Sequence, residues 1–459
     1  MGERKPLVFK VTRATPELVP PAAPTPYEFK ELSDIDDQEG LRFLMPLISF
    51  YKNGNHSTLG GCEPAKVIKE AVAKALVPYY PFAGRLRERP GRKLVVDCNA
   101  EGALFVEAHA DVTLDQFKEE DLRPPIPCLE DLIFHVPASA GVLHSPLFLF
   151  QVTRLKCGGF ILAVQYNHCM ADAAGFCQFL NAIAELARGG GPQLSVQPVW
   201  ERHLLRARDP PRITRLHHEH DDNVPIIIPT HNLVHRSFFF GPKEMSAFRR
   251  WVPPHLKSST TFEVLSACLW RCRTIALEPK PDEVVHFIPV VNARSKKNPP
   301  LPKGYYGNVL AYPAALCTAN ELIRNPLGYA IELIEKAKAT VTDEYMRSLA
   351  DLLVIKGRPR VIVTPYSFQV SDTTRAGFDQ TDYGWGLPVY GGNARKAVGF
   401  ASFYIPAKNK KGEKGIVLPI SLPAPAMERF VKELRWMLGE FSEHPNNGSG
   451  SSLLFPSSL

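Results

Sequence analysis

A histidine and an aspartate four positions apart are the first candidates for chemistry. His168 and Asp172, in the segment HCMAD, follow the apolar run 159–165 and precede a stretch with helical spacing. Histidine takes and gives a proton near neutral pH without a large pKa shift, so His168 at a strand-to-helix turn is a candidate general base. The alternative is a structural histidine capped by a backbone carbonyl, because the pattern alone is short. Asp172 either orients an imidazole or caps the following helix, and its spacing favours the cap.

Other clusters of reactive side chains are interpreted as non-catalytic. Cys169 follows His168 directly, and successive strand residues point to opposite faces, so we predict a packed and inert thiol. The segment LHHEHDD at 216–222 lacks the HExxH spacing of a metal site and lies in a stretch rich in Pro and Arg. It is predicted to be a solvated loop. Cys268 and Cys272 share a helix face with leucines and are predicted to fill the core.

Two segments, GYYGN at 304–308 and DYGWG at 382–386, place glycines beside large aromatic rings. Glycine allows positive φ or a close backbone approach while the neighbouring ring is held in place. The alternative is an ordinary β-turn. The chain has no GxSxG elbow, Walker A loop or GxGxxG fingerprint in a suitable context, so serine-hydrolase, P-loop and dinucleotide-binding functions lose their usual sequence support.

Composition limits the class of protein. The 459 residues suffice for about two to three domains, and the 45% hydrophobic and 22% charged content is that of a soluble globular protein. The net charge of +7 is spread along the chain rather than gathered in a stripe, which favours a phosphate-bearing cosubstrate over nucleic acid. Nine cysteines without a CxxC pair and no apolar stretch of signal-peptide or membrane-span length predict a reduced protein that is not secreted.

Hydrophobic periodicity predicts two α/β halves of similar size. In the first half we expect a helix at 65–76, paired strands within 93–108, a hairpin at 144–168 that turns at 157–159, and a helix after residue 172. A stretch rich in Pro, Arg and His is the candidate linker. The second half contains expected strands at 235–241, 284–294 and 415–422 and expected helices at 260–277, 332–354 and 426–438. The predicted domains are residues 1–189 and 233–459, joined by residues 190–232.

In their order and separation, HCMAD and DYGWG resemble HxxxD and DFGWG, the two signature motifs of the plant BAHD acyl-CoA-dependent acyltransferases. The likeness runs along nearly the whole chain, through YYPFAGRLRE, ARDPPRIT, VNAR and GYYGN, and is greatest to the branch that makes volatile esters. Tyr383 replaces the usual phenylalanine. The resemblance implies two chloramphenicol-acetyltransferase-like α/β domains of similar size, joined by a long crossover loop, with a solvent channel between them.

The resemblance also implies the role of each motif residue. His168 would take the proton from an alcohol that attacks the acyl-CoA thioester, in a ternary complex without an acyl-enzyme. Asp172 would turn away from the substrate and pair with Arg294.

The second motif and its neighbours receive roles in the same way. Trp385 would help to hold the tetrahedral intermediate, and Asn308 would lie near the channel. Asp382, Gly384 and Gly386 would be structural.

The cosubstrate implied by the resemblance is acyl-CoA, with no bound cofactor and no metal. Lys257 and Thr261 in KSSTTF and Ser371 and Arg375 in SDTTR are the candidate CoA contacts, since hydroxyls and cations suit phosphates. The expected reaction transfers benzoyl from benzoyl-CoA to benzyl alcohol. Acetyl-CoA with aliphatic alcohols is the alternative substrate pair, and a non-catalytic small-molecule binding protein on the same fold is the alternative of another class.

The last three residues, Ser457, Ser458 and Leu459, resemble the peroxisomal signal S-K-L with serine in place of the basic residue. A loop-like, frayed terminus is the alternative. The sequence therefore leaves peroxisome and cytoplasm open, with a peroxisomal import receptor as a possible partner. The resemblance leads us to expect a monomer, and the sequence predicts neither a nucleic-acid partner nor a membrane span.

Overall fold

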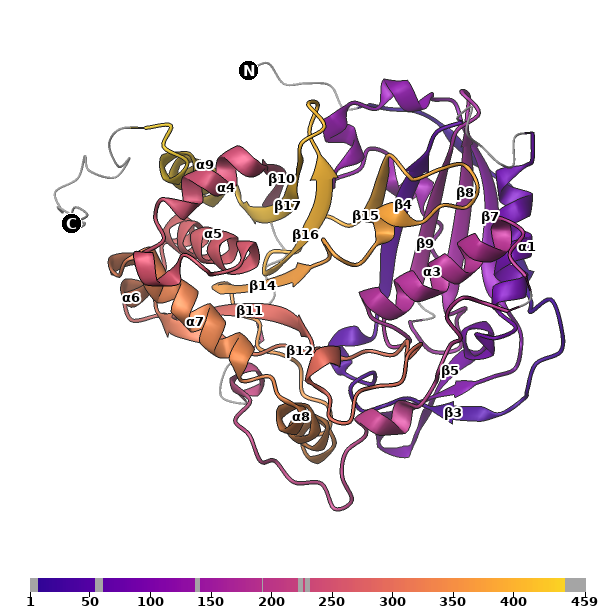
Figure 1. Cartoon of the computed structure of the whole chain (residues 1–459), viewed down its shortest axis with the longest axis horizontal. Coiled ribbons are helices and arrows are strands. Elements are labelled where there is room, and N and C mark those ends of the chain that lie inside the picture. The colour runs from indigo at the N-terminus through magenta and orange to yellow at the C-terminus, as the bar shows by residue number, and fades with distance from the viewer. Residues whose placement is uncertain are drawn as a thin grey trace.

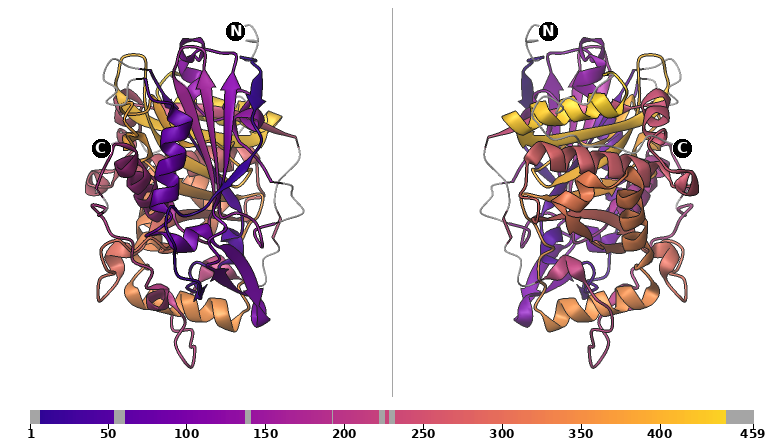
Figure 2. Two further views of the ribbon diagram at one scale, coloured as in Figure 1. Left: turned by 90° about the vertical axis from the view of Figure 1, so that its right-hand side faces the viewer. Right: turned by 90° about the vertical axis from the view of Figure 1, so that its left-hand side faces the viewer.

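The chain folds around two seven-stranded sheets that stand side by side (Figure 1). A computed structural model describes residues 7–53, 61–136, 141–191, 193–221, 226–227 and 232–441. Each sheet carries its helices on the face turned away from the other sheet (Figure 2). The predicted mixed α/β fold with two sheet-containing halves is confirmed. Within the described ranges, no helix is both long and apolar enough to cross a membrane.

The first sheet is built mainly from the N-terminal half. Its strands run in the order β1 (Val11–Arg13), β7 (Ala103–Ala110), β8 (Phe148–Leu155), β9 (Phe160–Asn167), β4 (Leu44–Tyr51) and β15 (Tyr390–Asn393), and β2 (Glu17–Val19) also pairs with β7. Helices α1 (Pro64–Ala75) and α3 (Ala173–Ala187) cover one face. The apolar sides of both helices pack on this sheet and form one core.

The hairpin of β8 and β9 presents the histidine motif. The two strands pair antiparallel, and every residue of β9 is buried, as an uninterrupted apolar run requires. The predicted hairpin with its turn at 157–159 and the predicted helix after residue 172 are both confirmed. Helix α3 begins because the Asp172 carboxylate accepts a hydrogen bond from the Gly175 N–H at 3.0 Å.

The second sheet belongs to the C-terminal half. Its order is β10 (Leu233–Phe240), β17 (Lys414–Pro423), β16 (Ala401–Lys408), β14 (Ser367–Asp372), β11 (Val284–Asn292) and β12 (Leu310–Ala311), and β13 (Ala315–Thr318) also pairs with β11. Its core is closed by α4 (Pro242–Arg249), α5 (Thr261–Leu277), α6 (Ala319–Arg324), α7 (Leu327–Ala339) and α9 (Ala424–Met437). Cys268 and Cys272 of α5 are buried there, so their prediction as core residues is confirmed.

One strand crosses between the halves. β15 comes from the C-terminal half of the sequence but pairs with β4 at the edge of the first sheet (Figure 1). The connection at 190–232 contains, in its described part, two short 3-10 turns, Arg202–Leu205 and His218–His220, and an isolated bridge from Val199 to Tyr305. The domain boundaries at 189 and 233 stay a prediction. By sequence β15 belongs to the predicted second domain, but it pairs with the sheet of the first.

Two expected elements differ from the structure. The strands within 93–108 do not pair with each other, because β6 (Lys93–Asp97) joins β3 (Phe29–Glu31) and β5 (Arg85–Arg89) in a separate three-stranded sheet. The helix expected at 332–354 is two helices, α7 and α8 (Asp343–Ile355). The helical periodicity continues across the break, but the Thr342 hydroxyl accepts from the Tyr345 N–H at 3.2 Å and starts a new helix.

Candidate active site

His168 stands one residue beyond β9, with its backbone fixed on both sides. Its N–H donates to the Phe43 carbonyl at 3.0 Å, and its own carbonyl accepts from the Asn308 side-chain amide at 2.9 Å. Phe43 immediately precedes β4 of the first sheet, whereas Asn308 comes from the GYYGN segment of the other half. The position of the histidine is therefore set by both halves of the chain.

The imidazole lies in an apolar surrounding. Its ring centroid is 5.3 Å from that of Phe43 and 5.7 Å from that of Tyr166, and the residue is only 9% exposed. Nδ1 is enclosed and has no hydrogen-bond partner within the described part of the chain. Burial lowers the pKa of His168 below its ordinary value, although the charge of Asp172 opposes this shift. The ring is therefore neutral at physiological pH, which is the form that a general base needs.

Asp172 is fully occupied by structural hydrogen bonds. Its two carboxylate oxygens accept from Arg294 at 2.6 and 2.9 Å, and they also accept from the backbone N–H groups of Gly175 and Val309. Burial alone would raise the pKa of Asp172, but the Arg294 charge and these donors outweigh burial and lower it. Asp172 thus caps α3 and ties it to the second half, and it makes no hydrogen bond to the imidazole.

A buried ion pair that the sequence analysis did not anticipate supports the same loop. Arg202 lies 3.0 Å from the Asp36 carboxylate and donates to the Met170 carbonyl at 2.8 Å. The Asn308 backbone N–H and side-chain amide both donate to Asp36, at 2.8 and 2.9 Å. The Arg202 guanidinium lies 4.4 Å from the centre of the Trp200 ring. This network joins the segment before β4, the connection and GYYGN beneath the histidine.

Two glycines permit close contacts of GYYGN, one with α3 and one with Arg202 of the connection. A Cβ on Gly175 would lie 2.0 Å from the Tyr306 carbonyl oxygen, and a Cβ on Gly307 would lie 1.6 Å from the Arg202 guanidinium. Both positions therefore require glycine for the close approach and not for positive φ. The expected close approach at GYYGN is confirmed, and Asn308 serves as a support below His168 and not as part of the cavity wall.

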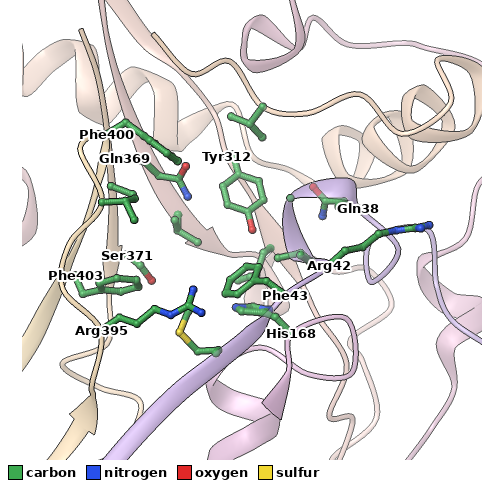
Figure 3. Close-up of a pocket in the computed structure, with 18 of the residues that line it drawn as sticks. Gln38, Arg42, Phe43, His168, Tyr312, Gln369, Ser371, Arg395, Phe400 and Phe403 are labelled. Atoms are coloured by element: carbon green, nitrogen blue, oxygen red, sulfur yellow. The ribbon is translucent and has the colours of Figure 1, made fainter. Parts of the chain in front are cut away.

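A cavity of about 450 Å³ opens beside His168 between the two sheets (Figure 3). Its wall is mainly apolar and draws on both halves of the chain. The aromatic members of that wall are Phe43, Tyr166, Tyr312, Phe378, Phe400 and Phe403. A hollow of this size and lining is typical of a site for a small organic molecule.

The DYGWG segment forms a tight turn away from this cavity. Asp382 accepts from the N–H groups of Gly384 and Gly386 at 2.7 and 2.9 Å, and both glycines have positive φ, 109° and 86°. The expectation that these glycines adopt positive φ is confirmed. Asp382, Gly384 and Gly386 thus build a turn that presents the rings of Tyr383 and Trp385.

Trp385 does not reach the histidine. It is 7% exposed and packs edge-on against Phe160, with the ring centroids 5.3 Å apart. Phe160 starts β9, whereas His168 follows the end of β9, and eight residues of a strand span roughly 25 Å. The expected role of Trp385 at the intermediate is therefore corrected: the motif is a core contact at the far end of the strand, which the sequence order of the motifs did not reveal.

The four candidate CoA contacts are dispersed. Ser371, on β14, lines the cavity. Lys257, Thr261 and Arg375 are exposed and do not line it. Thr261 opens α5, while Lys257 lies just before it.

The remaining reactive side chains are structural. Cys169 is fully buried, its Sγ lies 3.3 Å from the Leu41 carbonyl, and burial raises the pKa of its thiol well above the ordinary value. The prediction of a packed thiol is confirmed.

The LHHEHDD segment is not the solvated loop that we expected. His217, Glu219 and His220 are buried. The His217 ring is hydrogen-bonded to the Ser348 hydroxyl, and the Tyr345 hydroxyl donates to the Glu219 carboxylate. Ser348 and Tyr345 both lie on α8. These contacts replace water as partners of the polar groups, which composition alone does not indicate. No cluster of three metal-binding side chains occurs among the residues that the structure describes.

Comparison with known proteins agrees with this geometry. Residues 9–437 match the Transferase family. The chain is 60% identical over 439 residues to benzyl alcohol O-benzoyltransferase of Petunia hybrida, covering 94% of each chain. It is 54% identical over 444 residues to alcohol acyl transferase 1 allele GSa of Malus domestica, covering 95% of this chain and 96% of the relative.

Solved structures share the fold at low sequence identity. Vinorine synthase superposes with a TM-score of 0.72 at 22% identity, over 93% of this chain and 98% of its own. TRI101 of F. sporotrichioides, complexed with coenzyme A and T-2, gives 0.68 at 19% identity, over 89% of this chain and 98% of its own.

The family match and the close relatives show that the chain is an acyl-CoA-dependent alcohol O-acyltransferase, and a neutral histidine in the wall of an apolar cavity agrees with this activity. The chain belongs to the Transferase family, that of the BAHD acyltransferases. Acyl-CoA is its cosubstrate.

Proposed function

We propose that this acyltransferase transfers benzoyl from benzoyl-CoA to benzyl alcohol and releases benzyl benzoate and CoA. The observation that carries the proposal is the neutral imidazole of His168 at a cavity whose wall contains six aromatic rings. Flat aromatic groups pack well against such rings in offset or edge-on geometry. The 60% identity to benzyl alcohol O-benzoyltransferase of Petunia hybrida adds independent support.

The proposed reaction is a direct attack. The benzyl alcohol oxygen bonds to the thioester carbonyl carbon while Nε2 of the neutral His168 ring takes the hydroxyl proton. The tetrahedral intermediate then collapses, the carbon–sulfur bond breaks, and the departing thiolate receives the proton from His168. Proton transfer of this kind contributes about 10²- to 10⁴-fold to the rate.

No covalent acyl-enzyme takes part in this proposal. Cys169, the thiol next to His168 in sequence, is fully buried and bonded to the Leu41 carbonyl, and its raised pKa keeps it protonated. A protonated thiol is a poor nucleophile. Both substrates must therefore bind before product forms, and initial-rate lines measured at several fixed alcohol concentrations should intersect. Parallel lines would indicate an acyl-enzyme.

An aliphatic ester synthase that uses acetyl-CoA is the second candidate. It is favoured by the 54% identity to alcohol acyl transferase 1 allele GSa of Malus domestica. Assays of CoA-thiol release by the purified protein distinguish the two candidate functions. Benzoyl-CoA and acetyl-CoA are each tested with benzyl alcohol and with an aliphatic alcohol. We expect the highest kcat/KM with benzoyl-CoA and benzyl alcohol; a higher value for acetyl-CoA would support the second candidate.

Peroxisomal import through Ser457, Ser458 and Leu459 is part of the proposal, with a cytoplasmic protein as the alternative. These residues lie outside the described part of the chain. The support is their likeness to S-K-L. A reporter fused to the last ten residues should enter peroxisomes, and the same fusion without Ser458 should not; two cytoplasmic fusions would assign the protein to the cytoplasm. We also propose a monomer, which sedimentation of the purified protein tests.

A further inference from the structure

The cavity contains an arginine that the proposed reaction does not yet use. Arg395 lies two residues beyond the end of β15, and the adjacent Ala394 N–H still donates to the Pro46 carbonyl at 3.2 Å. The antiparallel register of β15 and β4 pairs Asn393 with Leu47 and, when continued, brings Arg395 level with Met45. Arg395 therefore follows the strand that crosses from the C-terminal half into the first sheet.

The same registers relate Arg395 to the histidine. β4 lies between β15 and β9, and neighbouring strands are about 4.8 Å apart. Phe43, two residues before Met45, is the partner of His168. The Arg395 backbone is thus two strand spacings and about two residues from that of His168, which a long side chain can bridge.

The Arg395 guanidinium and the His168 imidazole line the same cavity. The guanidinium lies 5.7 Å from the centre of the Phe43 ring, whose centroid is 5.3 Å from that of His168. Figure 3 shows Arg395 and His168 entering the same cavity, with Phe43 beside the histidine. A group held over Phe43 is therefore within reach of both side chains.

Arg395 forms no ion pair among the described residues, and only the more distant charge of Glu130 acts on it. Two other arginines of the cavity wall are paired, Arg42 with Asp37 at 2.9 Å and Arg360 with Glu39 at 3.4 Å. For Arg395 only the backbone N–H is bonded, to the Asn393 side chain at 2.9 Å. Burial lowers the pKa of Arg395 although the charge of Glu130 opposes this shift, and a partly desolvated cation is stabilised by a negative charge that enters the site.

Acyl transfer creates such a charge. When the alcohol attacks, the thioester carbonyl oxygen becomes an oxyanion, and donors aimed at that oxygen are a major source of catalysis. Neither Trp385 nor Asn308 lines the cavity, so neither supplies this donor. Several side chains that line the cavity carry donor groups, among them Tyr312, Lys396 and Arg395. Arg395 is the cation that lies against Phe43, beside the histidine, whereas the charge of Lys396 acts on His235 of the second sheet.

We infer that Arg395 is a further catalytic residue, whose guanidinium donates a hydrogen bond to the thioester carbonyl oxygen and stabilises the oxyanion formed there. The inference rests on acyl transfer by His168, but not on the benzoyl group, since every thioester carbonyl develops this charge. The bond from nucleophile to carbon forms as the carbonyl π electrons move to oxygen, and Arg395 keeps all its protons throughout.

Replacement of Arg395 by methionine tests the inference, with Lys408→Met as the control. Lys408 is an exposed cation at the end of β16 and does not line the cavity. With benzoyl-CoA and benzyl alcohol, Arg395→Met should lower kcat on the order of 10²-fold, the cost of losing one oxyanion donor. The dissociation constant of CoA and the melting temperature should stay near wild type. Lys408→Met should keep the wild-type kcat.

Rescue separates a chemical role from a structural one. Arg395→Lys should recover part of kcat, and methylguanidinium should raise the rate of Arg395→Ala saturably without affecting Lys408→Met. An unchanged kcat in Arg395→Met would overturn the inference while leaving acyl transfer standing. If Tyr312→Phe also lost kcat while Arg395→Met kept it, Tyr312 would be the donor instead. Wild-type protein that turns over neither benzoyl-CoA nor acetyl-CoA would overturn both.

Discussion

The Asp172 carboxylate and the Arg294 guanidinium face each other in a two-point ion pair, with oxygen–nitrogen distances of 2.6 and 2.9 Å across 122 residues of sequence. Arg294 also donates to the Gly307 carbonyl at 2.7 Å. The start of α3, and with it the histidine turn, is therefore fastened to the second half of the molecule.

Breaking this pair should lower both stability and rate. Arg294→Met leaves the buried Asp172 charge without its cation, and losing one partner of a buried pair costs about 3–5 kcal/mol of unfolding free energy. Activity should fall because the turn that carries His168 loses its tether. Chemical denaturation and initial rates measure the two effects. Arg347→Met, at an exposed intrahelical pair on α8, is the control and should cost little. Equal small losses in both variants would contradict this role.

The pH profile should reflect the buried imidazole. The pKa of His168 lies below the ordinary value of 6.5, and the base works only when neutral. The general-base form therefore persists as pH falls to 6.5, and kcat/KM should decline only below that pH. Initial rates between pH 5 and 8, with tryptophan fluorescence to verify folding at each pH, test the expectation. An acid limb with its midpoint above 6.5 would contradict the burial argument.

Trp385→Phe should keep most of the wild-type kcat. The ring packs on Phe160, so its loss should cost stability, about 1–3 kcal/mol, without touching the cavity. Thermal melting and steady-state kinetics separate these effects. A fall of 10²-fold or more in kcat at unchanged stability would restore the oxyanion role that the motif suggested.

Gly175→Ala should destabilise the protein, although alanine in a helix is ordinarily favoured by about 0.5–1 kcal/mol. The added Cβ would meet the Tyr306 carbonyl at 2.0 Å, so α3 and GYYGN must separate, at a cost of about 1–3 kcal/mol. Gly191→Ala is the control, because nothing lies within 4 Å of its Cβ position and its φ is not positive. A melting temperature unchanged in Gly175→Ala would contradict the contact.

The sequence predicted the parts of the site that depend on neighbouring residues. His168 at a strand-to-helix turn follows from an apolar run, a capping aspartate and helical spacing, all within one stretch of chain. The Asp36, Arg202 and Asn308 network was missed because its members are as far as 272 residues apart and meet only in the folded chain. No local pattern marks such a contact.

The misplacement of Trp385 has a related cause. A motif shows which residues occur together in sequence, but its distance from the histidine depends on which end of β9 it packs against. The crossing of β15 into the first sheet likewise depends on strand pairing between the halves. That pairing brings Arg395 to the cavity.

The most direct test is CoA-thiol release from benzoyl-CoA by wild-type protein and by His168→Ala, with and without benzyl alcohol. We predict release that requires the alcohol and that falls about 10²- to 10⁴-fold in His168→Ala, the contribution of a general base. The melting temperature of the variant should remain close to that of the wild type, because the imidazole Nδ1 makes no hydrogen bond within the described residues. Release that proceeds without alcohol, or at the same rate in a folded His168→Ala, would contradict general-base acyl transfer at this site.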